Sequence, residues 1–204
     1  MKDIDVRRAL YRKVLDEHQG QVDTIVLDEL GLCQGAARVD VAVVNGRIHG
    51  FEIKSQADTL GRLPQQAEVY CATLDQVTLV LHESHLDEAK ALVPNWWGLK
   101  VATGGSRGAV YFHQHRAAKL NPHPDPVAIA GLLWADEALA ILTRHGMDRG
   151  VRSKPRKELY ARLADRLPLE TLRDEVRAAL KKRHTWVKTH VFTTPSGSVA
   201  QPPA

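Results

Sequence analysis

The sequence predicts an α/β protein whose mixed sheet, flanked by helices, is followed by a small all-helical unit. Two strand-like runs flank the turn signal Asn45-Gly46, which is typical of a β-hairpin. The short, nearly continuous apolar run 76–81 indicates a strand covered on both faces. Beyond the proline-rich segment 121–126 the pattern becomes helical throughout. Alternating helices and strands followed by helices alone give this fold class.

The N-terminal unit, residues 1–120, is expected to alternate helices and strands. Apolar residues at helical spacing predict its helices, and apolar runs bounded by turn residues predict its strands. Pro64 is compatible with a helix only in the first turn or at a kink. In chain order we expect a helix over 3–18, strands over 22–30, 38–44 and 47–53, a helix over 60–74, a strand over 76–81, a helix starting near Ser84, and two strands on either side of the turn 104–108.

The second unit, residues 127–190, is predicted to be helical and basic, and the tail 191–204 to be disordered. Residues 151–190 hold twelve Lys and Arg against five Asp and Glu, whereas the whole chain has a net charge of +4. This concentration of positive charge is compatible with a polyanionic partner or with a solvated helix surface. The predicted helices cover residues 127–146, 154–167 and 169–184.

Composition places the chain among ordinary globular proteins, with 44% hydrophobic and 25% charged residues. The two cysteines, Cys33 and Cys71, do not form a CxxC motif, and we expect reduced thiols. The N-terminus lacks the apolar region of a signal peptide, and no stretch approaches the ~18 apolar residues of a membrane span. A cytoplasmic protein without membrane contact is therefore expected. The oligomeric state stays open.

The hairpin around Asn45-Gly46 raises a question of register, because carboxylates interrupt both apolar runs. A two-residue turn would place Glu52 on the same face as the valines of the first strand. A three-residue loop with Gly46 in a left-handed conformation instead gathers the apolar side chains on one face and Asp40, Glu52 and Lys54 on the other. This hypothesis places Val39, Val41, Val43, Phe51 and Ile53 on the apolar face.

Two neighbouring carboxylates repel each other unless they are protonated or bridged by a cation. Carboxylate oxygens suit Mg²⁺ or Mn²⁺, and we expect Asp40, Glu52 and the carbonyl of Ile53 to bind such an ion. Lys54 would position or activate a water molecule. These are the parts of a metal-assisted phosphodiester hydrolase. An edge hairpin with a solvated polar face is the alternative.

The residues Asp40 and Glu52-Ile53-Lys54, within the order helix, three strands, helix, strand, resemble the D…(D/E)xK signature of the PD-(D/E)XK nuclease superfamily. Gln66 and Tyr70 resemble the QxxxY motif of its RecB-like and lambda-exonuclease-like branches. The resemblance implies a restriction-endonuclease-like core. The chain from about residue 3 to 185 is also similar to a bacterial and phage group of PD-(D/E)XK-like proteins of unassigned physiological role.

The resemblance implies a catalytic group of Asp40, Glu52 and Lys54, with Gln66 and Tyr70 bracing Lys54 or the scissile strand. An upstream acidic residue often joins this site, and Glu29 is the first candidate, with Glu17 as the second. The expected function is a Mg²⁺-dependent deoxyribonuclease in repair, recombination or defence. A catalytically inactive nucleic-acid-binding relative and a scaffold protein are the alternatives. Endo- or exonuclease action and strand preference stay open.

The C-terminal segment 144–167 weakly resembles a SAP-type DNA-binding motif, although its loop is longer than that motif allows. A cluster of basic residues precedes a predicted helix there, and phosphates are favoured at helix N-termini. An ordinary helix pair with a basic surface is the alternative. The predicted DNA-contacting residues are Arg152, Lys154, Arg156 and Lys157.

Overall fold

The computed structural model describes residues 2–18 and 21–191, without the side chains of 17 and 185–191. Its centre is a six-stranded mixed sheet with the strands in chain order. Strands β3, β4 and β5 are mutually parallel, and the remaining neighbours are antiparallel. The predicted α/β class with a mixed sheet is therefore confirmed. The strands are β1 (Ile25–Leu32), β2 (Ala37–Val44), β3 (Ile48–Lys54), β4 (Gln76–His82), β5 (Gly98–Gly104) and β6 (Val110–Arg116).

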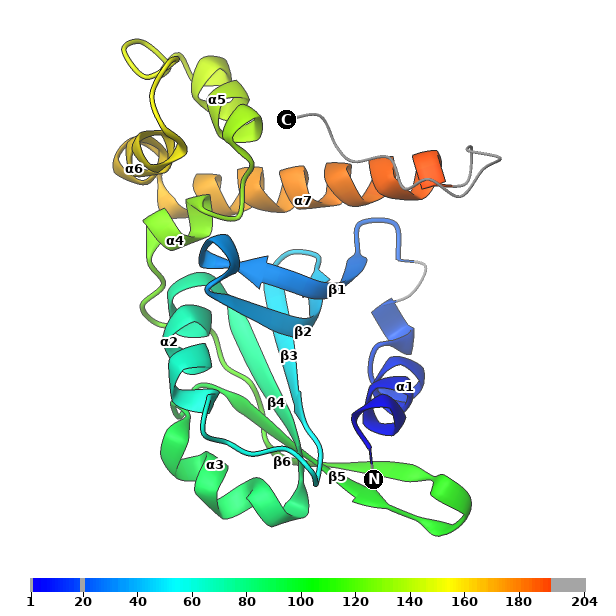
Figure 1. The fold of residues 1–204 in the computed structure, drawn as a ribbon. Coiled ribbons are helices and arrows are strands. Elements are labelled where there is room, and N and C mark those ends of the chain that lie inside the picture. The colour runs from blue at the N-terminus through cyan, green and yellow to red at the C-terminus, as the bar shows by residue number, and fades with distance from the viewer. Residues whose placement is uncertain (1, 19–20, 192–204) are drawn as a thin grey trace.

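Helices cover both faces of the sheet (Figure 1). Helix α2 (Leu63–Thr73) connects β3 to β4, and α3 (Leu86–Leu92) connects β4 to β5. A parallel pair of strands needs such a crossover, and the usual right-handed connection places both helices on one face. Helix α1 (Asp3–Lys13) covers the opposite face. Pro64 lies in the first turn of α2, where its missing N–H costs little.

The hairpin register follows the predicted three-residue loop, since Val44 pairs with Ile48 and Val41 with Phe51. The prediction of a left-handed conformation at Gly46 was wrong, because the glycines with positive φ in the described chain lie at other positions. Asn45 closes the loop instead. Its side chain accepts the Arg47 N–H at 3.1 Å, and its own N–H donates to the Arg47 carbonyl at 3.0 Å. An Asx-type turn thus replaces the left-handed glycine.

The predicted valine face is correct except for Val39. Val41, Val43, Phe51 and Ile53 pack with α1, whereas Val39 belongs to the larger cluster beneath α2. Strict alternation would place Val39 with Val41. The strand pair is distorted at this point: Glu29, opposite Asp40 between two regular pairs, has a φ of 55°. A bulge-like distortion of this kind re-aims side chains at the edge of a sheet.

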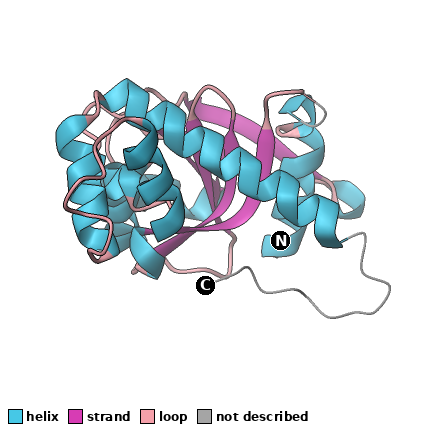
Figure 2. Ribbon diagram, turned by 90° about the horizontal axis from the view of Figure 1, so that it is seen from above, coloured by secondary structure: helices cyan, strands magenta, loops and turns pink. Residues whose placement is uncertain are grey.

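The C-terminal helices stack on the end of the sheet, and the longest helix runs across it (Figures 1 and 2). The predicted helix 127–146 is two helices, because the Trp134 N–H donates to Glu137 Oε2 at 2.7 Å and starts a new helix. The last helix continues beyond the predicted end at 184. The helices are α4 (Pro126–Ala130), α5 (Ala135–Arg144), α6 (Arg156–Arg166) and α7 (Leu169–Val191). Apart from Val191, the predicted disordered tail lies outside the described residues.

The proline-rich segment 121–126 is bonded to the end of α2. Asn121 Nδ2 donates to the carbonyls of Cys71 at 2.6 Å and Leu74 at 2.9 Å, and the Asp125 N–H donates to Ala72 at 2.8 Å. Apolar residues of α4 to α7 also belong to the same hydrophobic cluster as α2 and the sheet. The division into units 1–120 and 127–190 stays a prediction.

Within the described residues, no helix is both long and apolar enough to span a membrane. The cytoplasmic location stays a prediction.

Candidate functional site

Glu52 lies at the centre of a buried polar cluster that joins β3 to α2. Its neighbours are Lys54, two residues along the same strand, and Gln66 and Tyr70, one turn apart on α2; we call these four residues the Glu52 cluster. Lys54 Nζ lies 2.7 Å from Glu52 Oε1, and Gln66 Nε2 donates to the same oxygen at 2.8 Å. The Tyr70 hydroxyl lies 2.6 Å from Glu52 Oε2. The predicted grouping of these four side chains is thus present.

Glu52, Lys54 and Tyr70 of the cluster are buried, and Gln66 is half-buried. Glu52 and Lys54 are only 3% and 7% exposed, and Gln66 Oε1 accepts a further hydrogen bond from Lys54 at 3.0 Å. Burial, followed by the negative charge of Glu52, raises the pKa of Tyr70 far above its ordinary value, so its hydroxyl keeps its proton. A buried charge is tolerated only when it is paired and hydrogen-bonded, and both conditions are met here.

Asp40 lies where β2 and β3 separate. Its Oδ2 accepts the Ile53 N–H at 2.7 Å, so the carboxylate takes the place of a strand partner. Its Oδ1 accepts a hydrogen bond from Arg7 of α1 at 2.9 Å. Burial and the charge of Glu52 raise the pKa of Asp40 to about 6, although Ile53 and Arg7 oppose the rise. Asp40 therefore interacts electrostatically with Glu52 but bonds α1, whereas Glu52 and Lys54 bond α2, so the prediction that all three share one face was wrong for Asp40.

Arg7 connects Asp40 to three other carboxylates, Asp3, Asp28 and Glu29, at 3.3 to 3.7 Å. Burial lowers the pKa of Arg7, but Asp40, Asp3 and Glu29 outweigh this effect and raise it. Glu29 also pairs with Arg38 at 2.6 Å. Glu29 and Asp40 thus share Arg7 as an ion-pair partner. The side chain of Glu17, the second candidate, lies outside the described residues.

Arg7 was missed by the sequence reasoning. It belongs to an amphipathic helix with several other basic residues, and its position in the sequence does not distinguish it from the solvent-exposed cations of that helix. The one available signal is Asp3, four residues earlier on the same helix, which pairs with Arg7 at 3.6 Å.

The oxygens of the two carboxylates among the predicted metal ligands are already engaged. Asp40 accepts from Ile53 and Arg7, while Glu52 is bonded by Lys54, Gln66 and Tyr70. No group of three or more His, Cys, Asp or Glu residues suited to a metal occurs in the described part of the chain. As arranged, these residues do not fit a resident cation, because Mg²⁺ would have to displace Arg7 or Lys54. Binding of Mg²⁺ or Mn²⁺ stays a prediction.

The predicted DNA-contacting residues lie on different elements from the Glu52 cluster, in the segment before α6 and in its first turn. All four are exposed. Arg152 pairs with Asp148 at 2.5 Å and Lys154 with Glu158 at 3.8 Å, whereas Arg156 and Lys157 have no ion pair with any described residue. No side chain caps the N-terminus of α6. These residues keep the exposure that phosphate contact requires.

Comparison with known proteins gives one consistent result. The family model described as bacteriophage P4 protein cII matches residues 5–197. Protein cII of Enterobacteria phage P4 is 24% identical over 162 residues, which make up 79% of this chain and 60% of that protein. The chain thus spans about 60% of the length of this curated relative. No solved structure matches the chain significantly.

These matches contradict the predicted membership of the PD-(D/E)XK superfamily. The predicted metal-dependent nuclease and the alternative, an inactive member of that superfamily, are therefore wrong as well. The SAP-type resemblance also finds no support there. The D…ExK and QxxxY spacings are short, and a hairpin followed by a helix satisfies them whatever the chemistry. Such spacings predict the polar cluster correctly, whereas the superfamily inferred from them is wrong. Nearly the whole chain matches one family model, and the protein belongs to the bacteriophage P4 protein cII family.

Proposed function

We propose that this protein binds DNA, through phosphate contacts in a basic groove between α1 and the β5–β6 hairpin. The groove has a volume of about 450 Å³. The observation that carries the proposal is its set of four cationic side chains, from two elements, against one carboxylate, Asp5. We call it the α1–hairpin groove; its cations are Arg8, Arg12, Lys13 and Arg107.

These cations are available to a ligand. All four are exposed, and Arg8, Arg12 and Arg107 have no ion pair with any residue that the structure describes. Asp5 is partly engaged, because its Oδ2 accepts the Lys2 N–H at 3.1 Å. Unpaired guanidinium groups on two walls favour the phosphate oxygens of a polyanion, which they contact in bidentate fashion.

The hairpin wall carries no opposing charge. The sequence has no Asp or Glu between Glu88 and Asp125, a stretch that includes all of β5 and β6. Nucleic acid approaching the hairpin wall therefore meets positive charge and no carboxylate from that wall, which accelerates association.

The two walls of the groove are joined before any ligand binds. Lys13 Nζ donates to the Val110 carbonyl at 2.7 Å and lies 4.8 Å from the centre of the Tyr111 ring. At the hairpin turn, Arg107 and Gly108 both have positive φ, at 56° and 76°. Consecutive left-handed residues match the twist of a hairpin, so the turn presents Arg107 in a defined position.

The exposed cations before α6 are a second predicted contact to DNA, supported by the unpaired Arg156 and Lys157 and the uncapped helix end. The relative's name, protein cII, states no activity, so the proposal rests on the charge arrangement. Catalysis stays a prediction that no comparison tests.

The test is fluorescence anisotropy with a labelled DNA duplex over a range of salt concentrations. We expect the Arg8→Gln, Arg12→Gln, Arg107→Gln triple variant to bind at least about tenfold more weakly at low salt, with the salt slope reduced by about 3. The matched control removes three exposed cations elsewhere, Arg62, Lys90 and Arg166, each as Gln. Equal loss in both variants, or no binding by the unaltered protein, contradicts the proposal.

A further inference from the structure

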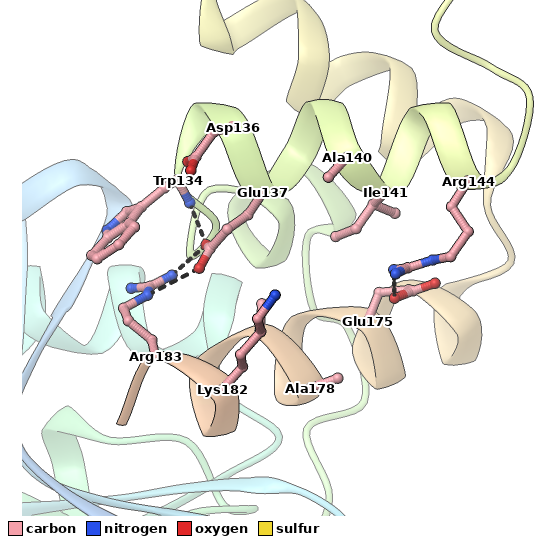
Figure 3. A pocket seen from close by; sticks show the side chains of 11 residues that line it. Trp134, Asp136, Glu137, Ala140, Ile141, Arg144, Glu175, Ala178, Lys182 and Arg183 are labelled. Carbon is pink, nitrogen blue, oxygen red and sulfur yellow. Dashed lines mark hydrogen bonds and ion pairs between the residues drawn. The ribbon is translucent and has the colours of Figure 1, made fainter. Parts of the chain in front are cut away.

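A separate pocket of about 360 Å³ lies between α5 and α7 (Figure 3). We call it the α5–α7 pocket. Pockets of small-molecule ligands usually start at about 300 Å³, combine an apolar lining with a few polar groups, and are largely formed in advance. Neither the Glu52 cluster nor the α1–hairpin groove contributes to its lining. Ala140, Ile141, Ala178 and Ala179 form its apolar part.

Trp134 closes one end of the pocket and is held there by Arg183. The Arg183 guanidinium lies 4.1 Å from the centre of the Trp134 ring. Its NH2 contacts Glu137 Oε2 at 2.6 Å and the Leu132 carbonyl at 3.2 Å. These contacts fix the aromatic wall in the free protein, and Trp134 remains 39% exposed. A ligand that packs against the ring does not have to order it first.

The lining holds three carboxylates and three basic side chains, of which Asp136 and Lys182 have no ion pair with any described residue. Glu137 is balanced by Arg183, and Glu175 by Arg144. Asp136 lies in the first turn of α5, where the helix dipole stabilises a carboxylate. Lys182 lies within α7, far from either helix end, and pairs with no described residue. Figure 3 shows it on the side of α7 that faces the pocket.

We propose that the α5–α7 pocket binds a small amphiphilic anion. The apolar, ring-bearing body of the ligand lies against Trp134 and Ile141, and its carboxylate, sulfonate or phosphate group is neutralised by Lys182. Burial of the body supplies most of the affinity, and the ion pair selects for charge. This site is independent of the proposed binding of DNA.

The test uses two fluorescent probes that differ by one charged group. 1-Anilinonaphthalene-8-sulfonate carries a sulfonate, and N-phenyl-1-naphthylamine is its uncharged counterpart. We expect saturable binding of both, with the sulfonate favoured about three- to fivefold, as an exposed ion pair allows. Lys182→Gln should remove this preference. Lys90→Gln, at an exposed lysine of α3 outside the pocket, should keep it.

A second variant links the binding to this pocket. Ala178→Phe fills the space from an exposed helix position and should abolish binding of both probes, while the far-ultraviolet circular dichroism stays unchanged. The proposal is overturned if neither probe binds saturably, if Lys182→Gln keeps the preference, or if Ala178→Phe binds both probes as the unaltered protein does.

Discussion

The Glu52 cluster and the α1–hairpin groove both concentrate charge, but they treat it in opposite ways. In the Glu52 cluster, carboxylate, ammonium, amide and hydroxyl groups satisfy one another away from water. In the groove, three guanidinium groups have no carboxylate partner among the described residues and remain in solvent. Internal pairing consumes the binding capacity of a charged group, whereas exposure without a partner preserves it.

This difference separates stability from binding. Substitutions in the Glu52 cluster are expected to change the free energy of unfolding, since each removes a partner from a buried polar group. Substitutions in the groove are expected to change affinity for DNA and leave unfolding almost unaltered. The predictions below test the contrast from the largest expected effect to the smallest.

Replacing Lys54 with Ala leaves Glu52 buried without its cation. We expect a loss of about 3 to 5 kcal/mol in the free energy of unfolding, the range for breaking one side of a buried ion pair. Urea denaturation followed by circular dichroism measures it. Combining Lys54→Ala with Glu52→Gln should recover part of the loss. A loss below about 1 kcal/mol in the single variant would mean that water or another cation compensates.

Acidification tests Asp40, whose pKa is raised to about 6 from an ordinary value of 3.8. The folded protein holds this proton more tightly than the unfolded chain, so Asp40 contributes stability below about pH 4 that disappears as pH rises through 6. One pH unit is worth about 1.4 kcal/mol, so the contribution is at most about 3 kcal/mol.

The measurement is the free energy of unfolding between pH 4 and 7 for the unaltered protein and for Asp40→Asn. The variant should lack the part of the pH dependence that belongs to Asp40. Identical profiles would show that Asp40 titrates near its ordinary pKa in the folded protein.

Tyr70→Phe removes the hydroxyl at Glu52 Oε2 and keeps the ring, which stacks on Trp97 with 5.8 Å between ring centres. We expect a loss of about 1 to 3 kcal/mol, the cost of an unsatisfied buried acceptor. Thermal and urea unfolding both report it. Tyr11→Phe is the matched control, since its hydroxyl bonds the exposed Asp28. A larger effect at Tyr11 than at Tyr70 would reverse the proposed ranking.

Arg8→Gln and Arg12→Gln should change the free energy of unfolding by less than about 0.5 kcal/mol, as exposed substitutions away from specific contacts do. Their affinity for DNA should nevertheless fall. Chemical denaturation and anisotropy on the same preparations provide both values. If the variants lose stability and keep affinity, the groove is a structural feature and the comparison with the Glu52 cluster fails.

The sequence predicted local geometry better than chemistry. The alternation of apolar and polar residues predicted the hairpin register correctly. The apolar residues of the two strands share a face only if the loop has three residues, as it does. Gln66 and Tyr70 share a helix face because one turn separates them, and the QxxxY resemblance predicted that they brace Lys54. Gln66 does contact Lys54, and both helix residues also bond Glu52. The identity of the family was not recoverable in the same way, since a few polar residues at common spacings occur in unrelated proteins.

The remaining errors have local physical causes. Val39 changed clusters because Glu29 interrupts the regular alternation with a positive φ. The break between α4 and α5 was not predicted, because it depends on a hydrogen bond from the Trp134 N–H to the Glu137 side chain within a run of good helix formers. The role of Arg7 depends on a bond from α1 to Asp40 of β2, a long-range contact that no short sequence pattern encodes.

The bonded segment between β6 and α4 has a mechanical consequence. Asn121 and Asp125 bond this segment to the last turn of α2 and to Leu74, which follows α2. Helix α2 also carries Gln66 and Tyr70. Segment 121–126 is therefore not a free linker, and a force that pulls on the C-terminal helices acts directly on α2. In a single-molecule pulling experiment, the first resistance should come from these hydrogen bonds and the apolar contacts beside them.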